Sequence, residues 1–422
     1  MTTTFSASEL ARSPAGDEPW AIRPGRALLP SGEVRSGLEV VVAGDVITSV
    51  ALIGDGLVDP VQAIDVPEAT LLPGLIDTHV HLTFSGDGMV VENVITESVP
   101  MQLARAAGNA QRALARGVTT AVDCGGKTEV VTALRDGIAA GGLRGPRLLV
   151  SGAPLTTTAG HCHWLGGCAD SPDEVIREVR RLVASGVDIV KVMVTGGNTT
   201  PGSNPGQLQF DPEVVLAVGR ECARLGKTLV AHAHTREAVA LAAAAGAGVV
   251  AHATFADASG GVGASPETVA ALVEARSYVD PTLMVGAVAQ PGSTPDHPSG
   301  RRMRLRSSMI PLFRDMHASG VPLLAGTDGG VPGVPHGSVA GAVVALHHEV
   351  GLDVGGALGA ATSVAASAYG LSHEVGALAP GLRADLLLVD GLVDREIEAV
   401  SRPLAVWQAG ELVASRGLVS YA

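Results

Sequence analysis

Short apolar runs alternate with amphipathic segments rich in Ala, Leu and Arg through the middle of the chain. Runs of this length that end in polar or glycine-rich loops are typical of buried strands, and the amphipathic segments between them are typical of helices. Strands and helices that alternate in this way indicate a parallel sheet covered by helices. The first such strand lies around Pro73 and leads into His79 and His81.

Seven further runs and five intervening helices repeat this pattern. The strands are expected over residues 118–123, 147–152, 188–194, 228–232, 249–252, 278–283 and 322–326. The helices are expected over residues 101–115, 172–184, 212–225, 265–275 and 303–318, and two more over 338–350 and 355–369. Eight strand–helix units favour an α/β fold of the (β/α)8 TIM-barrel type, with the chemistry at the carboxyl ends of the strands. A doubly wound open sheet is the alternative.

Both ends of the chain have a different, β-rich texture, with Gly-Asp turns at 44–45 and 54–55 near the N-terminus and a turn at 408–410 near the C-terminus. Neither end has enough strands to be stable alone, so we expect residues 19–72 and 377–422 to pair into one small β-sandwich domain. The barrel then occupies residues 73–376. Residues 1–18 lack the basic and apolar regions of a secretory signal and are expected to form a disordered tail.

The composition and charge of the chain argue against nucleic-acid and membrane partners. Of the 422 residues 46% are apolar and 17% are charged, with a formal net charge of −13. The arginine cluster at 301–306 is interpreted as the solvated start of a helix, so the sequence predicts no nucleic-acid partner. The longest apolar run, 238–251, is mostly Ala and Gly and is too short to span a bilayer. We therefore expect a cytoplasmic protein that has no membrane partner.

Candidate chemistry begins at His79 and His81. Residues two apart on a strand point to the same side, so two imidazoles can face one point and form half of a metal site. Lys191 lies within the apolar run 188–194, where a charged ammonium is costly. A neutral lysine can add CO2 to give a carbamate, which can bridge two metals. The alternatives are ordinary loop histidines and a lysine paired with a carboxylate.

Three more polar residues close later runs: His232, His252 and Asp328. A barrel places ligands at such strand ends. Each residue alone is compatible with a core or turn role, but their recurrence after His79 and His81 favours a metal site.

These six positions resemble the ligand set of the binuclear amidohydrolase superfamily. The segments 188–197, 231–234, 325–329 and 377–386 resemble its imidazolonepropionase-like branch, which includes Xaa-Pro dipeptidases. The chain departs from that pattern at Ala251, where a Glu is usual, and in most of the loop 158–167.

The resemblance implies two Zn2+ per chain, bridged by carboxylated Lys191 and by a hydroxide that attacks an amide carbonyl. Asp328 would take the proton and pass it to the leaving nitrogen. His161 or His163, and His234, would steady the carbonyl oxygen or a substrate carboxylate. His336 is a further candidate for binding substrate.

The expected enzyme is a binuclear metal-dependent amidohydrolase that hydrolyses an amide, peptide-like or N-acyl amino acid C–N bond. The alternatives are a hydrolase that opens a cyclic amide, a mononuclear deaminase, and a non-catalytic assembly protein on the same fold. The complete ligand set argues against the assembly protein. The expected partners are a small-molecule amide or peptide-like substrate and further copies of the chain in a homo-oligomer.

Overall fold

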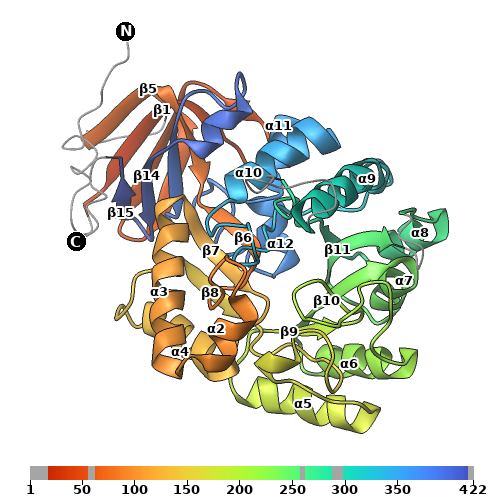
Figure 1. Ribbon diagram of the computed structural model, residues 1–422. Coiled ribbons are helices and arrows are strands. Elements are labelled where there is room, and N and C mark those ends of the chain that lie inside the picture. Colours follow the sequence, from red (N-terminus) through yellow and green to blue (C-terminus); the bar gives the residue numbers. More distant parts are fainter. Residues whose placement is uncertain (1–17, 56–61, 257–261, 288–297, 417–422) are drawn as a thin grey trace. The chain divides into compact units, whose positions relative to one another are not determined.

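The structure is a computed structural model, and it describes residues 18–55, 62–256, 262–287 and 298–416 (Figure 1). The tail predicted at residues 1–18 lies, except for Glu18, outside the described residues. The chain divides into two compact units. Unit 1 comprises Met1–Ile76, Gln111–Thr120 and Val339–Ala422, and unit 2 comprises Asp77–Ala110 and Ala121–Ser338. Unit 1 thus contains the helices after residue 338, and the domain limits inferred from the sequence stay a prediction.

Unit 1 is organised around one eight-stranded sheet, in the order β15-β14-β13-β5-β1-β3-β4 with β2 paired to β1. Its strands are β1 (Trp20–Leu28), β2 (Val34–Arg35), β3 (Leu38–Ala43), β4 (Val46–Leu52), β5 (Gln62–Pro73), β13 (Leu386–Asp390), β14 (Pro403–Gln408) and β15 (Glu411–Ser415). The sheet is mixed, because β1 and β5 run parallel while the other paired strands run antiparallel. Strands from the two ends of the chain pair through β5 and β13.

Two tryptophans pack against each other in the core of this sheet. Trp20 on β1 and Trp407 on β14 are almost fully buried, and their ring centroids lie 5.6 Å apart. Two other strands separate β1 from β14, which corresponds to roughly 14 Å in a flat sheet at normal strand spacing. The two indole rings therefore lean toward each other over β13 and β5. A sandwich of two separate layers stays a prediction.

Unit 2 contains the alternating strands and helices. One sheet has the order β6-β7-β8 and a second, parallel one has the order β12-β11-β10-β9. The strands are β6 (Leu75–Val80), β7 (Val118–Asp123), β8 (Arg147–Val150), β9 (Ile189–Met193), β10 (Thr228–Thr235), β11 (Val249–Ala256) and β12 (Tyr278–Asp280). Seven of the eight predicted strands thus form. The mixed α/β class is confirmed.

The eighth predicted strand, 322–326, does not form a regular ladder. Leu323 and Gly329 make single parallel bridges, to Val279 and Val80, and Leu155 bridges Val192 between the two sheets. The backbone N–H of Thr327 donates to the Asp77 carboxylate instead of to a strand. A closed barrel of eight regular strands is therefore not formed by the described residues.

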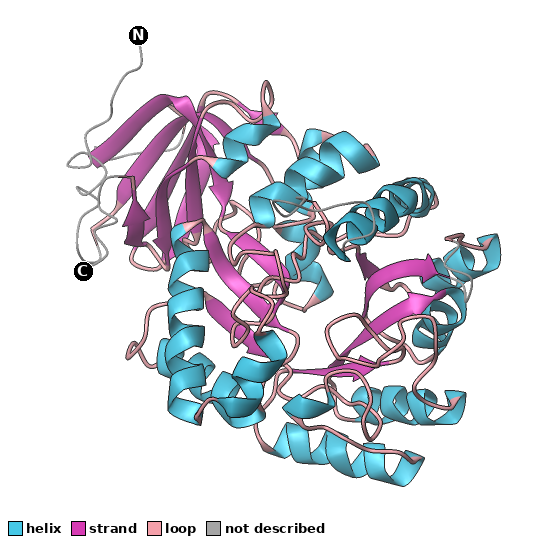
Figure 2. Cartoon of the chain, viewed as in Figure 1, coloured by secondary structure: helices cyan, strands magenta, loops and turns pink. Residues whose placement is uncertain are grey.

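Helices follow most strands, and α5, α6 and α7 lie on one side of β9, β10 and β11 (Figures 1 and 2). The helices of unit 2 are α2 (Val90–Thr96), α3 (Val99–Ala115), α4 (Thr128–Ala139), α5 (Pro172–Ala184), α6 (Pro212–Arg224), α7 (Arg236–Ala244), α8 (Pro266–Glu274) and α9 (Pro298–Ala318), of which α3 ends in unit 1. Those of unit 1 are α10 (Val339–Ala345), α11 (Val354–Gly359) and α12 (Ser363–Ala368), with a π-helix at Leu346–Val350. Among the described residues, no helix is long and apolar enough to cross a membrane.

Candidate metal centre

The predicted ligands meet at the ends of the strands of unit 2. His79 and His81 lie at the end of β6, Lys191 in β9, His232 in β10 and His252 in β11. Asp328 follows the bridged segment 322–326. All six residues line one cavity. The strand order thus brings together residues that are far apart in the sequence.

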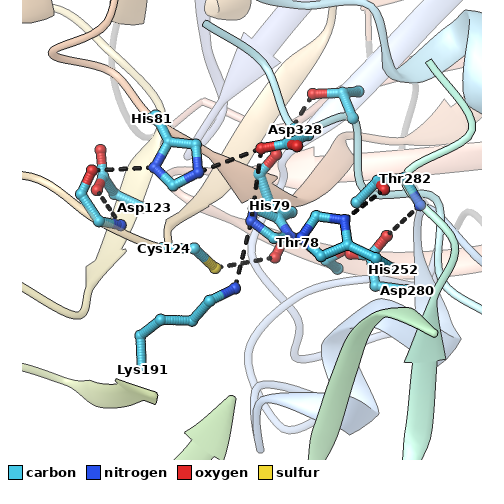
Figure 3. Close-up of polar contacts among 12 residues, drawn as sticks. Thr78, His79, His81, Asp123, Cys124, Lys191, His252, Asp280, Thr282 and Asp328 are labelled. Carbon is cyan, nitrogen blue, oxygen red and sulfur yellow. Dashed lines mark hydrogen bonds and ion pairs between the residues drawn. The ribbon is translucent and has the colours of Figure 1, made fainter. Parts of the chain in front are cut away.

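The first ligand group consists of His79, His81 and Asp328, whose candidate ligand atoms all lie within 4.8 Å of one another. Asp328 Oδ1 is 3.2 Å from His81 Nε2 and 3.7 Å from His79 Nε2. Figure 3 shows these side chains converging, with Lys191 reaching toward them from β9. Lys191 Nζ lies 3.4 Å from His79 Nε2.

The second ligand group consists of His232, His234 and His252, which satisfy the same 4.8 Å limit. The ring centroids of His232 and His252 are 4.6 Å apart, and those of His79 and His252 are 5.3 Å apart. The two groups are therefore neighbours in one cavity.

Hydrogen bonds orient the histidines toward that cavity. His81 Nδ1 lies 3.0 Å from the carbonyl oxygen of Gly125, and His232 Nε2 lies 2.9 Å from that of Gly196. A carbonyl oxygen only accepts, so each of these nitrogens must carry the hydrogen. The other nitrogen of each neutral ring then presents a lone pair to the cavity. His81 Nε2 consequently faces the Asp328 carboxylate, an arrangement that needs a cation or an added proton between them.

His252 and His234 are held in a similar way. His252 Nδ1 lies 2.9 Å from Thr282 Oγ1, and His234 Nδ1 lies 3.2 Å from Thr254 Oγ1. The Thr254 hydroxyl already donates to the His234 carbonyl oxygen, so it accepts from the His234 ring. Partners of this kind fix the ring orientation of metal-binding histidines.

Burial sets the protonation of the site. Loss of water around a charged imidazolium lowers the pKa of His79, His232 and His252 well below the usual range, and nearby positive groups act in the same direction. Burial also lowers the pKa of His234 to about 4. Neutral imidazole is the form that binds metal ions, so these side chains are prepared for that role at neutral pH.

Asp328, unlike these histidines, is charged at neutral pH. Burial acts to raise the pKa of its carboxyl, but the hydrogen bond with His81 and the attraction of neighbouring groups outweigh that effect and lower the pKa to about 2. The carboxylate is therefore ionised at neutral pH. An anionic oxygen among lone-pair nitrogens is a suitable ligand set for a divalent transition metal.

Two buried carboxylates support the ligand-bearing segments, and the sequence analysis missed both. Asp77 accepts from Thr327 Oγ1 at 2.8 Å and from the backbone N–H of His79 at 3.2 Å. Asp280 accepts from the backbone N–H of Thr282 at 3.1 Å. Asp77 precedes His79 by two residues on the same strand, so strand alternation could have indicated it.

The backbone is strained where these ligands lie. His252, Thr282 and Asp328 have φ values of 68°, 48° and 60°, in the left-handed region that non-glycine residues rarely adopt. Such conformations persist where the surrounding structure enforces them, and they concentrate at functional sites. In addition, a Cβ on Gly326 would approach Asp280 Oδ2 to 1.9 Å, so this position admits only glycine.

The remaining predicted site residues separate into two classes. His161 and His234 line the cavity. His163 is exposed, lies outside the cavity lining and contacts the carbonyl oxygen of Gly160 through Nδ1 at 2.9 Å. His336 is buried outside the lining, with Nε2 3.2 Å from the carbonyl oxygen of Phe84. The structure therefore does not bring His163 or His336 to the predicted site.

Residues 70–413 match the model of the amidohydrolase family. The chain belongs to this family. It is 28% identical to ochratoxinase of Aspergillus niger over 390 residues, which cover 82% of this chain and 76% of that protein.

Several solved structures are also similar to this chain. One is a Xaa-Pro dipeptidase with methionine bound in its active site, with a TM-score of 0.83, 26% identity and coverage of 94% of this chain and 99% of that one. Another is a prolidase complexed with N-methylphosphonate-L-proline, with a TM-score of 0.82, 25% identity and coverage of 94% and 100%. Together with the family match, these relatives support a metal-dependent amide hydrolase.

Proposed function

We propose that this amidohydrolase cleaves the C–N bond of a peptide-like or N-acyl amino acid amide with two zinc ions. His79, His81 and Asp328 would hold one ion and His232 and His252 the other, with carboxylated Lys191 between them. The observation that carries the proposal is the pair of adjacent ligand groups in one cavity. Zinc ions in such a site lower the pKa of water and polarise a carbonyl group.

Residues of the chain supply the rest of the chemistry. Asp328 is ionised and can accept the proton of the attacking water and return it to the leaving nitrogen. His161 lines the cavity, and its buried Nδ1 has no hydrogen-bond partner among the described residues. A buried nitrogen without a partner is costly, and a polar substrate atom would satisfy it. We therefore assign His161 to the substrate carbonyl oxygen or carboxylate.

The bridges at Leu155, Val279 and Val80 support a further inference about the fold. They connect the two sheets of unit 2 in the order of a (β/α)8 barrel, so we infer that this is the architecture around the site. The relatives support the substrate class, because one binds methionine and another a phosphonate derivative of proline.

The test combines metal content with hydrolysis. Purified protein loaded with Zn2+ should contain two zinc ions per chain by elemental analysis and should hydrolyse at least one member of a panel of N-acyl amino acids, dipeptides and cyclic imides. Chelation should abolish that activity and added Zn2+ should restore it. Protein that binds no metal would contradict the proposal and favour an assembly role. Hydrolysis of the cyclic imides alone would favour the ring-opening alternative.

His234 gives a second test, because it satisfies the same distance limit as the assigned ligands. The assigned set is complete without it, so we expect it to contact the substrate. His234→Ala should raise KM or lower kcat/KM by roughly tenfold while zinc content stays at the wild-type value, as when a binding contact is lost. Loss of one zinc ion per chain would make His234 a ligand and would contradict the choice of His232.

A further inference from the structure

His161 lies in the irregular segment between β8 and α5, outside any helix or strand. It is nevertheless only 5% exposed, and it lines the cavity that holds the ligand groups. The next residue, Cys162, has a φ of 61°, in the left-handed region that non-glycine residues rarely adopt. Such a backbone persists only where neighbouring contacts enforce it. The contacts of this turn therefore decide where the His161 ring lies.

Two side chains from a different segment hold the turn. The backbone N–H of His161 donates to Gln209 Oε1, and the backbone N–H of Cys162 donates to Thr200 Oγ1 at 2.8 Å. The same Thr200 oxygen accepts from Trp164 Nε1 at 3.1 Å. Both acceptors belong to the segment between β9 and α6, and Thr200 is buried. Consecutive backbone donors at 161 and 162 are thus bound by that one segment.

Gln209 is itself fixed to the strand that carries Lys191. Its Nε2 donates to the carbonyl oxygen of Met193, the last residue of β9, at 2.9 Å, and to Thr156 Oγ1 at 3.2 Å. A carbonyl oxygen only accepts, so the amide nitrogen must face Met193 and the amide oxygen must face His161. Gln209 therefore connects the backbone of His161 to β9 in a defined orientation.

The same segment also packs against the His161 ring. A Cβ on Gly197 would approach His161 Nε2 to 2.3 Å, so the close contact requires glycine there. Asn198 and Thr199, which follow Gly197, line the cavity. The ring centroid of His161 lies 4.9 Å from that of His232. The segment between β9 and α6 thus contacts both the backbone and the ring of His161 beside the ligand groups.

We propose that Gln209 and Thr200 are positioning residues, which hold His161 so that its buried Nδ1 can meet a polar atom of the substrate. This inference rests on the proposed function, in which His161 contacts the substrate carbonyl oxygen or carboxylate. Neither Gln209 nor Thr200 is among the described lining residues, so each acts through the turn at 161–162. The segment between β9 and α6 thereby determines how well the enzyme binds its substrate.

The first test is a double-mutant cycle on the best substrate of the panel. Gln209→Met removes the donor and the acceptor at similar volume and should lower kcat/KM by roughly tenfold, as when a contacting group is misplaced. In an enzyme that already carries His161→Ala, the same change should alter kcat/KM by no more than about twofold. Gln111→Met, at an exposed position on α3, is the matched control and should behave as the wild type.

The second test needs no hydrolysis. Diethyl pyrocarbonate modifies accessible neutral histidines, and peptide mass spectrometry measures the modification at each position. His161 should react slowly in the wild type because it is buried. Gln209→Met, and Thr200→Val, which removes the oxygen that binds the Cys162 N–H, should each speed its modification by roughly tenfold through local opening. The exposed His317 on α9 should react at the same rate in all three proteins.

Several outcomes would overturn the assignment. Unchanged kcat/KM in both variants, or effects of Gln209→Met and His161→Ala that multiply, would contradict it. So would unchanged modification of His161 in variants that are folded by circular dichroism. If the wild type hydrolyses no member of the panel while both variants expose His161, the positioning role is supported and the proposed function is contradicted. If Gln209→Met does not fold, Thr200→Val decides by the same two measurements.

Discussion

Replacing Asp328 with Asn is expected to lower kcat by roughly three to four orders of magnitude, because proton transfer and metal activation are impaired together. The pKa of Asp328 is held at about 2, chiefly by the hydrogen bond with His81, so the carboxylate is anionic throughout the neutral range. An amide of the same shape has no negative charge and cannot accept the proton. The substituted side chain would fill the space without performing either role.

The measurement is steady-state kinetics on the best substrate of the panel, with zinc content and thermal unfolding recorded on the same samples. Asp173→Asn, at an exposed aspartate in the first turn of α5, is the matched control and should keep wild-type kcat. Asp328→Asn should unfold near the wild-type temperature, since the change conserves volume. Near-normal kcat in a fully metallated variant would contradict the assignment of Asp328.

Much of this site could be predicted from the sequence because the ends of the strands can be recognised from the pattern of apolar and polar residues. The observed β7 and α5 have the predicted bounds, and the predicted helix start at Ser265 is present as a capping hydroxyl. Ser265 Oγ accepts from the backbone N–H of Thr268 at 3.2 Å, and Pro266 follows at the first helical position. Regular alternation of apolar runs and caps thus located the residues that face the cavity.

The eighth predicted strand shows the limit of prediction from local sequence patterns. Its apolar run is a good local candidate, yet the backbone of Thr327 is bound by the side chain of Asp77, a residue 250 positions earlier. Gly326 also lies against Asp280, with no room for a Cβ. These long-range contacts interrupt the strand pairing, which is limited to single bridges at Leu323 and Gly329, and no local pattern contains them.

The orientation of side chains in loops was the second feature that the sequence could not predict. His161 and His163 have the same spacing as His79 and His81, but they lie in an irregular segment where strand alternation does not apply. Cys162 between them has a φ of 61°, which turns the chain so that His161 is buried and His163 is exposed. Such a backbone reversal at a non-glycine residue has no sequence signature.

The surroundings of Lys191 point to a chemical modification of its side chain. It is 1% exposed, and the neighbouring residues Val190 and Val192 on β9 are fully buried. Within the described part of the chain, no carboxylate oxygen forms an ion pair with Nζ, and its polar contact is His79 Nε2 at 3.4 Å. The alternative of a lysine paired with a carboxylate is therefore not observed.

An unpaired charge is costly to bury in this position. A free amine can attack CO2, which forms an N–C bond, releases a proton and leaves a carbamate anion. Two zinc ions in the adjacent ligand groups would stabilise that anion and offset the cost of burying it. The geometry suits such a bridge, because the rings of His79 and His252, one from each group, lie 5.3 Å apart beside Lys191.

Lys191→Ala is therefore expected to lower kcat by roughly four orders of magnitude and to reduce zinc content below two ions per chain. The fold should persist, since the ladders on both sides of β9 are formed by the backbone. Lys127→Ala, a half-buried lysine before α4, is the matched control and should retain activity and zinc. A small carboxylic acid such as acetate, added to Lys191→Ala, should restore part of the activity by supplying the missing bridging oxygens.

The direct measurement is carbon NMR of wild-type enzyme prepared with isotope-labelled bicarbonate, together with a high-resolution electron-density map of Lys191. A carbamate signal that is absent from Lys191→Ala and present in Lys127→Ala is the expected result. A bare amine at Lys191 in a fully metallated and active enzyme would contradict the bridged pair of ions. In that case His79, His81 and Asp328 would hold a single ion, and the mononuclear alternative would account better for the site.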